Sequence, residues 1–548
     1  MYPWVMIPVR GGSVGIPGKN RRNLAGKPLV SYVIETALLV TKKNKIIIVT
    51  DDAELKYLAN NYNIQVLFLQ KQTGDETLDQ IAYFAAEHLR LELNVNVDEI
   101  FLTIQATCPF ITPLTINKVL RCFENEKIKS VITVTSIKHL HWMINNNKPL
   151  ALFTTRVNRQ KLKPIFKESG AIIGAKISDI LKNKTRIIEP IKLIKLSDKE
   201  GLDIDNPIDF KVADIFLSRK KILIKADSSI KIGMGHLYRS CAISYELLGH
   251  DVKICSNISG DKKLSNHFFD NSVYNFKSFK SDKEFVNYCV KQKPDLIILD
   301  QLNTTKNYIN QLKKSKAKII TFEDMGEGAS DADFLISDLY KNHNVNDKKQ
   351  FYGVNYSIMN PSFEWVEVKK LNKNVKNIVI LFGGTDYLNL SLMTLLALKK
   401  ISFNGNVFLI QGIGKTNKIN SLSKFGLNGE IYNNVEFMPE IMGKADLAIS
   451  SAGRTITELM SMAIPTICLC QNEKELTHTH ASQAHGVLNL GLGSFVNEEF
   501  LSKNIEFLIN NFSFRKKMHL KAIKTIATKK TNKEILREVG EKIKLSLF

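Results

Sequence analysis

The sequence predicts an α/β protein built on mostly parallel sheets, and two observations support this fold class. Short β-branched runs such as "KIIIVTDD", "EIFLTIQA" and "SVITVTS" alternate with amphipathic stretches of helical length such as "PLVSYVIETALLV". This alternation is typical of units in which a helix connects two parallel strands. A strand followed by a glycine-bearing turn and a helix also begins three times, near residues 7, 222 and 377. We therefore expect several nucleotide-binding α/β units in succession.

The chain of 548 residues is too long for one ordinary core, so several domains are expected. A predicted helix at residues 210–217 ends in the basic run "SRKK", and a new strand begins at Ile222. We place a domain boundary there, between an N-terminal unit of residues 1–218 and a second part of residues 221–548. The third start divides the second part into lobes of about 221–370 and 371–548, with a cleft between them. The lysine-rich tail after about residue 512 is expected to be helical.

Composition describes a soluble globular protein, with 44% hydrophobic and 24% charged residues. No apolar run of about 18 residues is present, so no transmembrane helix is expected. The start "MYPWVMIPVR" has the pattern of a buried strand and not of a signal peptide. The seven cysteines are odd in number and scattered, which favours reduced thiols and a cytoplasmic location.

A net charge of +22 raises the question of nucleic-acid binding. The lysines are spread along the chain, and no zinc-finger spacing or aromatic RNA-binding signature accompanies them. We therefore expect neither a nucleic-acid nor a membrane partner, while the positive field suits anionic small substrates. The "TICLC" run of Cys468 and Cys470 is expected in a buried core. His478, His480 and His485 are expected at a nucleotide site or the surface, since no third metal ligand has convincing spacing.

The first glycine-rich turn lies in "IPVRGGSVGIPGKN", residues 7–20. It is not a Walker A loop, because no G-K-[ST] closes it. Backbone N–H groups at its glycines, together with nearby basic and polar side chains, suit a triphosphate approached from several sides. A purely structural turn is an equally good interpretation of this stretch alone.

Two further segments favour the functional interpretation. In "EGLDIDNPIDF", Asp203 and Asp205 are two residues apart on a strand-like stretch, so both carboxylates should project from one face. Such a pair suits Mg²⁺ that bridges nucleotide phosphates, although D-x-D is often only solvated surface. The segment "NRQKLKPIFKESGAIIGAK", residues 158–176, is basic at first and then small and apolar.

Together, "RGGSVGIPGKN", "IQATCPF", "NRQKLKPIFKESGA" and "DIDNPIDF" resemble the acylneuraminate (CMP-sialic acid) cytidylyltransferases over about residues 3–218. The resemblance implies transfer of CMP from CTP to the anomeric hydroxyl of a nine-carbon 2-keto sugar acid, with release of pyrophosphate. The site would then catalyse the reaction mainly by positioning the reactants and by neutralising charge on the leaving pyrophosphate. Members of this family commonly dimerise, so a homodimer is possible.

The resemblance also implies roles for individual residues. CTP would be held by Arg10, Gly11, Gly12, Ser13, Lys19 and Asn20, with Arg10 and Lys19 in catalytic roles. The sugar acid would be bound by Gln105 and by Arg159, whose guanidinium can pair with a carboxylate in bidentate fashion. Mg²⁺ would be held by Asp203 and Asp205.

Three positions depart from the family pattern. Val14 stands where a lysine that neutralises the triphosphate is usual, and its loss could cost several kcal/mol of transition-state stabilisation. Lys71 is the nearest cation where an arginine is usual, and Ser169 replaces a common asparagine. An N-terminal unit that only binds nucleotide or scaffolds a pathway is therefore an alternative.

The second part contains a histidine in a suitable place for acid–base chemistry. In "KADSSIKIGMGHLYRS", His236 follows G-x-G at the start of a helix. A helix N-terminus disfavours imidazolium, so a neutral histidine there suits a general base, or else is a solvated polar residue. Gly383 and Gly384 form a turn in "ILFGGTD", and "AISSAGRTITELMSMAIP" places Glu458 where it could accept hydrogen bonds from ribose hydroxyls.

These motifs resemble the GT-B sugar-nucleotide enzymes. More narrowly, "DSSIKIGMGH", "LIILDQL", "TFEDMG", "FYGVNYSIMNPSF", "ILFGGTD" and "SSAGRTITE" resemble the UDP-sugar hydrolase of pseudaminic acid biosynthesis over about residues 221–490. The resemblance implies that His236 activates water against the anomeric carbon, and that Asp227 orients water or His236. Asp300 and Asp324 match acidic positions without an assigned role. UDP would be cradled by Gly235, Gly383, Gly384, Gly453, Thr455 and Glu458.

The resemblances combine into one expectation. A UDP-diacetamido-trideoxyhexose hydrolase acts early in nonulosonic acid synthesis, and a cytidylyltransferase acts at its end. We therefore expect a bifunctional enzyme for a sialic-, legionaminic- or pseudaminic-type acid. The alternative for the second part is a GT-B glycosyltransferase, in which an acceptor hydroxyl attacks in place of water.

Overall fold

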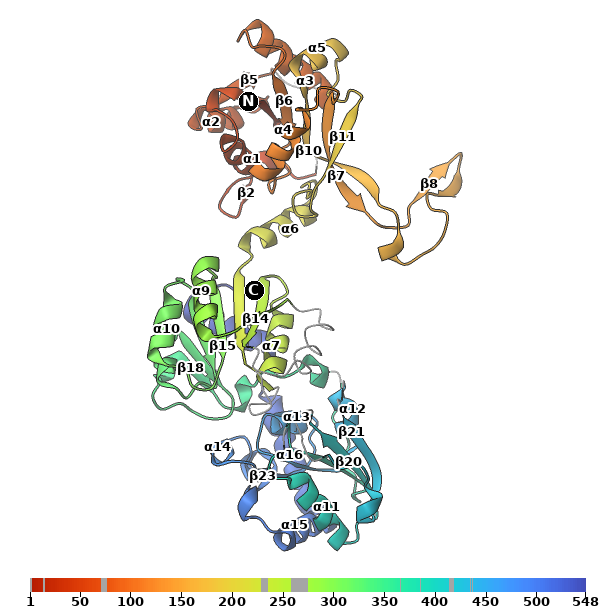
Figure 1. Cartoon of the computed structure of the whole chain (residues 1–548), viewed down its shortest axis with the longest axis vertical. Coiled ribbons are helices and arrows are strands. Elements are labelled where there is room, and N and C mark those ends of the chain that lie inside the picture. The colour runs from red at the N-terminus through yellow and green to blue at the C-terminus, as the bar shows by residue number, and fades with distance from the viewer. Residues whose placement is uncertain are drawn as a thin grey trace. The chain divides into compact units, whose positions relative to one another are not determined.

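The computed structural model describes residues 2–12, 15–69, 76–227, 235–257, 275–364, 366–384, 386–412, 418–433, 435 and 437–548 (Figure 1). The chain divides into two compact units, Met1–Ser218 and Arg219–Phe548. Each unit is an α/β structure with its own buried core, which confirms the predicted fold class.

Unit 1 is built on a seven-stranded sheet in the order β11-β7-β10-β6-β1-β4-β5. All neighbouring strands in it are parallel except for β10, which is antiparallel to both β6 and β7. Its strands are β1 (Trp4–Pro8), β4 (Ile46–Thr50), β5 (Gln65–Phe68), β6 (Ile100–Ile104), β7 (Ser130–Ile137), β10 (Ile165–Lys176) and β11 (Ile191–Lys195). A short hairpin of β2 (Asn23–Leu24) and β3 (Lys27–Pro28) lies beside it.

Helices cover both faces of this sheet, as a mostly parallel sheet requires. The core on one face includes side chains from α1 (Leu29–Leu38), α2 (Ala53–Asn61) and α4 (Pro113–Cys122). The core on the other face includes side chains from α3 (Leu78–Leu91) and α5 (Ile177–Asn183). The unit ends with α6 (Pro207–Ser218), which contains the helix predicted at residues 210–217.

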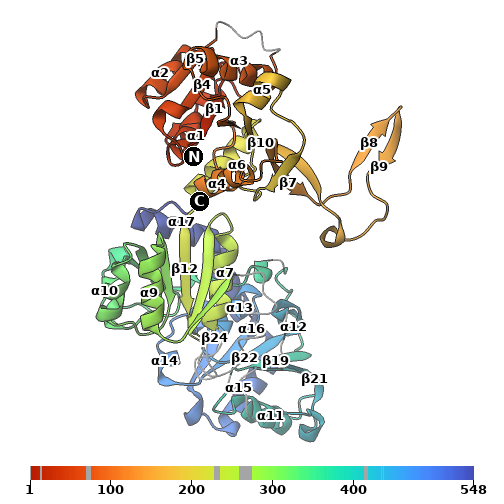
Figure 2. The ribbon, with the colours of Figure 1, turned by 45° about the horizontal axis from the view of Figure 1, so that its top comes forward.

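A hairpin of β8 (Trp142–Asn145) and β9 (Lys148–Ala151) extends away from the sheet between β7 and β10 (Figures 1 and 2). Several of its apolar side chains are exposed: Trp142 by 54%, Ile144 by 68% and Leu150 by 48%. An apolar surface of this kind on an extended arm is typical of a contact with another molecule.

Unit 2 contains two lobes, each with an entirely parallel sheet. The first has the order β14-β13-β12-β15-β16-β17-β18, with strands β12 (Lys221–Ala226), β13 (Asp251–Asn257), β14 (Phe276–Phe279), β15 (Leu296–Asp300), β16 (Lys318–Phe322), β17 (Phe334–Ser337) and β18 (Gln350–Tyr352). The second has the order β21-β20-β19-β22-β23-β24, with strands β19 (Asn377–Leu381), β20 (Asn406–Gln411), β21 (Asn428–Asn433), β22 (Leu447–Ser450), β23 (Thr466–Cys470) and β24 (Val487–Leu492).

The helices of the two lobes follow the same alternation. The first lobe has α7 (Gly235–Glu246), α9 (Asp282–Gln292) and α10 (Lys306–Lys313). The second lobe has α11 (Leu390–Lys400), α12 (Met438–Lys444), α13 (Thr455–Ser461), α14 (Glu473–Leu476), α15 (Glu498–Asn510) and α16 (Phe512–Ala527). Cys468 and Cys470 are fully buried in β23, as predicted for core cysteines.

The last helix, α17 (Asn532–Ile543), returns to the first lobe. Figure 2 shows α17 beside the strands of the first lobe. Its buried side chains Ile535, Leu536 and Val539 join the core formed by β12, β15, β16 and β17. The second lobe therefore does not include the whole of the expected range 371–548, because the apolar face of α17 is buried against the first sheet.

In each of the three sheets the strand order reverses beside the first strand of that sheet, at β1, β12 or β19. Ligands of open α/β sheets bind outside the carboxyl ends of the strands at this reversal point. In the sequence, the glycine-rich stretches follow these same three strands. Among the described residues, no helix is both long and apolar enough to cross a membrane.

Candidate functional site

A cavity of about 340 Å³ lies at the carboxyl ends of β1, β4 and β6 in unit 1. Five of the predicted site residues line it, namely Arg10, Lys19, Asn20, Gln105 and Asp205. They come from three segments that are distant in the sequence: the first glycine-rich turn, the end of β6 and the D-x-D motif. The fold therefore brings these predicted residues together around one space.

The glycine-rich turn packs closely against the D-x-D segment. A Cβ added to Gly15 would lie 2.2 Å from the backbone oxygen of Asp205, so only glycine fits there. The N–H of Gly11 donates to Asp51 Oδ1 at 2.7 Å, which corrects the expectation that this group is available to a phosphate. A Cβ added to Gly12 would meet nothing within 4 Å. Ser13 and Val14, which were predicted to matter here, lie outside the described residues, as does Lys71.

The two aspartates lie in a loop before α6 and not on a strand, which corrects the strand prediction. Lys19 Nζ donates to the backbone oxygen of Ile204 at 2.6 Å and pairs with Asp205 Oδ1 at 3.1 Å. Burial raises the pKa of Asp203, and the nearby Asp205 carboxylate adds to the increase while Lys19 opposes it. Asp205 and Lys19 are therefore close enough to Asp203 for their charges to shift its pKa.

The surroundings of Asp203 have features that fit a divalent cation. Within the described part of the chain, Asp203 Oδ1 is buried and has no hydrogen-bond partner. Burying such an oxygen is unfavourable unless a donor or a cation satisfies it. No group of three or more His, Cys, Asp or Glu side chains gathers among the described residues. Mg²⁺ commonly uses only one or two carboxylates and completes its shell with phosphates and water, so a pair of aspartates is compatible with such a site.

Gln105 follows β6 directly, and its side-chain amide packs against the bulge in β10. A Cβ on Gly170 would lie 2.6 Å from Gln105 Nε2, and the φ of Gly170 is +68°. Glycine at this position thus permits the close approach. Ser169 faces the core instead, because its hydroxyl exchanges hydrogen bonds with Thr133.

Arg159 is not among the residues that line the cavity. It begins the 3-10 helix Arg159–Lys161, on the same connection that carries the β8–β9 hairpin, and it is exposed. The hairpin on this connection extends away from the sheet (Figure 1). Gln105 lines the cavity and Arg159 does not, so their joint binding of one ligand stays a prediction.

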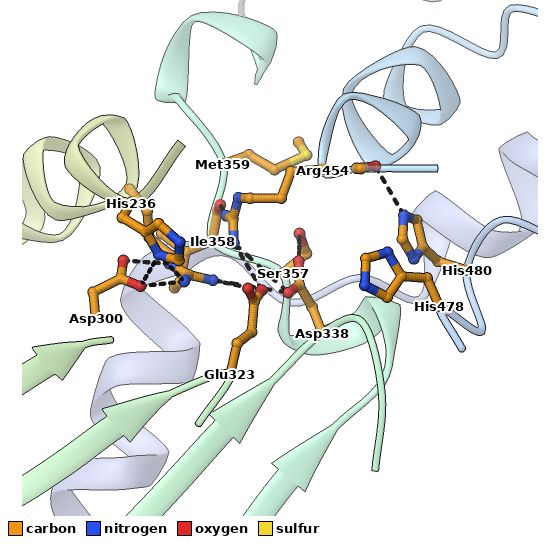
Figure 3. A network of polar contacts seen from close by, with 12 residues as sticks. His236, Asp300, Glu323, Asp338, Ser357, Ile358, Met359, Arg454, His478 and His480 are labelled. Atoms are coloured by element: carbon orange, nitrogen blue, oxygen red, sulfur yellow. Dashed lines mark hydrogen bonds and ion pairs between the residues drawn. The ribbon is translucent and has the colours of Figure 1, made fainter. Parts of the chain in front are cut away.

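In unit 2, His236 lies in the first turn of α7, beside the reversal point of the first lobe. It is buried, and its Nδ1 lies 2.6 Å from Asp300 Oδ1, at the end of β15 (Figure 3). A carboxylate on one ring nitrogen fixes the imidazole orientation and tautomer, and leaves Nε2 to accept a proton. Asp300 had no role from the sequence, and the structure makes it the partner of His236.

Asp227 does not contact His236. It pairs with Lys225, accepts a hydrogen bond from Asn257 N at 3.0 Å and accepts another from Gln301 Nε2 at 2.7 Å. The expectation that Asp227 orients His236 is therefore wrong. Asp324 holds a turn, since it accepts hydrogen bonds from Thr304 and from Gly326 N.

Sequence reasoning missed Arg239, which lies one turn after His236 on α7. Its Nε donates to Asp300 Oδ2 at 2.7 Å, its Nη2 also bonds Asp300, and its Nη1 donates to Glu323 Oε1 at 2.6 Å. Although burial raises it, Arg239 and His236 hold the pKa of Asp300 below its ordinary value. The signal in the sequence was the i, i+3 spacing of His236 and Arg239, which puts both side chains on one helix face.

Glu323 was also missed. It follows β16 and is 2% exposed, and its φ of +51° is a left-handed conformation that is uncommon outside glycine. Burial opposes its ionisation, but Arg239 and Arg454 hold the pKa of Glu323 well below its ordinary range. Burial, together with this neighbouring carboxylate, raises the pKa of Asp338 to about 7. Asp338 accepts a hydrogen bond from Ser357 Oγ at 2.5 Å.

The predicted UDP-binding turns of the second lobe follow the adjacent strands β19 and β22. Gly383 has a φ of +69°, and a Cβ on Gly412 would lie 2.3 Å from the backbone oxygen of Gly384, so two turns pack tightly here. Gly453 precedes α13, whose first residue is Thr455. Burial raises the pKa of Glu458, one turn into α13, to about 7.

The histidines of "ELTHTHASQAH" stabilise the turn after β22. His478 Nδ1 lies 2.8 Å from the oxygen of Ala452, and His480 Nε2 lies 3.0 Å from the oxygen of Gly453. Burial lowers the pKa of His480 to about 4, so this ring is a neutral donor. Two consecutive carbonyl groups are therefore fixed by two buried imidazoles, next to the predicted nucleotide site. His485 lies apart, near Thr525 Oγ1 at 3.1 Å.

Two families match the chain. The cytidylyltransferase family matches residues 4–230, and the glycosyltransferase family 28 C-terminal domain matches residues 377–535. The CMP-N,N'-diacetyllegionaminic acid synthase of Legionella pneumophila is 31% identical over 221 residues, which are 38% of this chain and 93% of that protein.

Two other relatives match a larger share of the chain. The uncharacterized protein MJ1062 of Methanocaldococcus jannaschii is 30% identical over 315 residues, 50% of this chain, and the chain spans 64% of its length. The spore coat polysaccharide biosynthesis protein SpsG of Bacillus subtilis is 24% identical over 312 residues, 54% of this chain and 91% of that protein. A match over 54% of the chain is longer than unit 1, so it includes residues of unit 2. Through unit 1 the chain belongs to the cytidylyltransferases, as a homologue of the CMP-sialic acid synthases, and it joins to that unit a glycosyltransferase-type domain of family 28.

Proposed function

We propose that unit 1 transfers CMP from CTP to a nonulosonic acid and releases pyrophosphate. The observation that carries this proposal is the convergence of Arg10, Lys19, Gln105 and Asp205 on one cavity at the reversal point of the sheet. The similarity to the Legionella CMP-N,N'-diacetyllegionaminic acid synthase supports a sugar acid of this class.

The residues of the chain suit the proposed reaction. The sugar hydroxyl attacks the α-phosphorus, and the bond to the β,γ-pyrophosphate breaks. Arg10 and Lys19 offset the negative charge that develops on the leaving group. Gln105 offers an amide to the sugar acid. A cation held by Asp203 and Asp205 would add charge neutralisation at the phosphates.

The test is a product assay of the full chain with CTP and a panel of sialic, legionaminic and pseudaminic acids. Pyrophosphate release with one acid, lost in Gln105→Leu but not in the exposed-surface variant Lys42→Ala, supports the proposal. Silence with every acid, together with measurable CTP binding, would favour the alternative of a non-catalytic nucleotide-binding unit.

We infer that the chain forms a homodimer through unit 1. The exposed apolar side chains of the β8–β9 hairpin, among them Trp142 and Ile144, support a contact between copies. Sedimentation of the full chain would show a dimer, and the double substitution Trp142→Ser with Ile144→Ser would shift it to monomer. A monomeric wild-type chain would refute this inference.

For unit 2 we propose hydrolysis of a UDP-diacetamido-trideoxyhexose. The observation that carries it is His236 with Nδ1 held by Asp300, which leaves Nε2 as a base. Water would give its proton to Nε2 and attack the anomeric carbon, and the bond from that carbon to the UDP oxygen would break. The whole chain would then serve an early and a late step of nonulosonic acid synthesis.

A glycosyltransferase is the second candidate for unit 2, and the family 28 match at residues 377–535 favours it. The two candidates differ in whether water or an acceptor hydroxyl attacks. Release of UDP by the full chain without any acceptor, abolished by His236→Gln, supports the hydrolase. Release that occurs only with an added acceptor would establish the transferase instead.

A further inference from the structure

Arg454 belongs to the second lobe, but its guanidinium binds groups of the first. It lies between β22 and α13, and its Nη1 donates to Glu323 Oε1 at 3.0 Å. Its Nη2 donates to the backbone oxygen of Ile358, in the segment that joins the lobes, at 2.5 Å. A Cβ on Gly235 would lie 3.7 Å from Arg454 Cδ, so the arginine stem passes beside the residue that precedes His236.

Arg454 and Arg239 bind the same oxygen of Glu323. Arg239 Nη1 lies 2.6 Å from Oε1, and Arg454 Nη1 lies 3.0 Å from it. Arg239 also binds both oxygens of Asp300, and Asp300 binds His236. Charged contacts therefore run without a break from the second lobe to the imidazole (Figure 3).

Burial makes this chain of contacts stiff. The side chains of Arg239, Asp300 and Glu323 are between 0% and 3% exposed, so water cannot replace a lost partner. The left-handed backbone of Glu323 is a strained conformation, of the kind found where a side chain must be held in one place. The planar fork of an arginine fixes direction as well as charge.

The turn that carries Arg454 also carries the predicted nucleotide-binding residues Gly453 and Thr455. Its carbonyl groups are held by His478 and His480, so the position of the turn is fixed by side chains of the same lobe. A displacement of this turn would remove Arg454 from Glu323 and release one of the two cations that hold the carboxylate.

We propose that Arg454 is a positioning residue that couples the placement of the second lobe to the orientation of His236, through Glu323, Arg239 and Asp300. The inference rests on the proposed function of unit 2 only for its effect on catalysis. In the lobe arrangement of this structure, Arg454 completes the charge balance around Glu323, and the imidazole is held in one orientation.

The test uses the full chain with ¹⁵N-labelled histidine, and reads the ring nitrogens of His236 by two-bond ¹H–¹⁵N NMR. His236→Gln identifies the signals. The wild-type protein should show a single tautomer with the proton on Nδ1. Arg454→Ala should give averaged ring signals and lower kcat for UDP release by about tenfold to a hundredfold, with KM changed by less than about threefold.

Three further variants separate positioning from a general loss of structure. Glu323→Gln should disturb the same ring signals, while Arg537→Ala, at an exposed arginine of α17, should not. Arg454→Lys keeps the charge but loses the fork, so its signals and kcat should fall between those of the wild type and Arg454→Ala. This variant carries the test if Arg454→Ala does not fold.

Unchanged His236 signals in both Arg454 variants would overturn the proposal. If the wild-type chain never releases UDP, the proposed hydrolase function fails, but the NMR comparison still decides the coupling. Altered ring signals without any UDP release would thus support the coupling alone.

Discussion

The two units place their predicted sites at equivalent points of their sheets but differ in how they treat charge. In unit 1 the Lys19–Asp205 pair is partly open, with the side chains 12% and 70% exposed. In unit 2 the Arg239–Asp300 pair is enclosed, with the side chains 1% and 0% exposed. Solvent-exposed pairs are weak and exchangeable, whereas enclosed pairs are held in fixed geometry.

This difference matches the ligands that the two sites are proposed to take. A triphosphate and a cation bring charge of their own. Lys19 and Asp205 must therefore be able to separate, so that the lysine can pair with a phosphate and the aspartate with the cation. A site that aims one imidazole at a sugar needs its charges balanced beforehand. Asp300 and Glu323 are therefore offset by Arg239 and Arg454 within the protein itself.

The largest expected effect comes from removing one enclosed charge. Arg239→Met leaves Asp300 and Glu323 buried with too little compensation, which should lower the free energy of unfolding of unit 2 by about 3–5 kcal/mol. Arg21→Met in unit 1 removes an arginine that is 43% exposed from Asp52, which keeps its hydrogen bonds to the N–H groups of Glu54 and Leu55, and should cost about 0–1 kcal/mol. Urea unfolding of both full-length variants, followed by circular dichroism, measures the contrast. Equal losses in the two units would contradict it.

The second prediction concerns the pH dependence of the stability of unit 2. The pKa of Asp338 is about 7 in the folded unit, against 3.8 ordinarily, so between about pH 4 and 7 the folded state holds a proton that the unfolded chain has released. Stability from this group therefore falls as pH rises through that window. Asp338→Asn mimics the protonated form and removes the dependence.

The free energy of unfolding of unit 2 in Asp338→Asn, measured relative to the wild type, should increase by about 2 kcal/mol between pH 5 and pH 8. The lowered pKa of Glu323 makes stability depend on pH only below about its ordinary value of 4.5, which is outside the pH range of this experiment. Urea unfolding at four pH values measures the difference. Parallel pH profiles for the two proteins would show that Asp338 is ionised throughout.

The sequence predicted the parts of the molecule that local pattern determines. Buried strands such as β4 and β6 are continuous apolar runs. The glycine-rich turns follow β1, β12 and β19 in the sequence, and His236 comes after β12. The D-x-D pair and Gln105 were also identified from motifs. Their meeting in one cavity follows from strand order, which the resemblance to a family implied.

Local pattern could not reveal the enclosed charge network. Arg239 and Glu323 are 84 residues apart, and Glu323 and Arg454 are 131 apart, so only the packed fold brings them together. The same reason explains the wrong partner for His236, because Asp227 is near in sequence but Asp300 arrives on the neighbouring strand β15. The return of α17 to the first lobe is equally a matter of tertiary packing.

In unit 1, a change in a backbone contact should affect CTP binding more than the free energy of unfolding. Gly15→Ala forces a Cβ against the backbone of Asp205, so it should separate the two segments and weaken CTP binding by about tenfold to a hundredfold. Gly249→Ala in unit 2 is the control, because its added Cβ meets nothing within 4 Å and lies outside the CTP site, and CTP binding should stay within about twofold. Calorimetric titration with CTP measures both. Similar losses in both variants would mean that the contact of Gly15 is not the determinant.

The smallest expected effect tests whether Gln105 recognises the sugar acid and not the nucleotide. Gly170→Ala places a Cβ 2.6 Å from Gln105 Nε2 at a φ of +68°, so the amide must move while the glycine-rich turn and the D-x-D segment stay in place. Because the amide is the flexible end of a side chain, we expect KM for the sugar acid to rise by about threefold to tenfold, with the KM for CTP unchanged. Steady-state pyrophosphate release with each substrate varied in turn separates the two constants. A rise in the KM for CTP alone would assign Gln105 to nucleotide binding. The identified side chains of both units would then act mainly on the nucleotide and its phosphates.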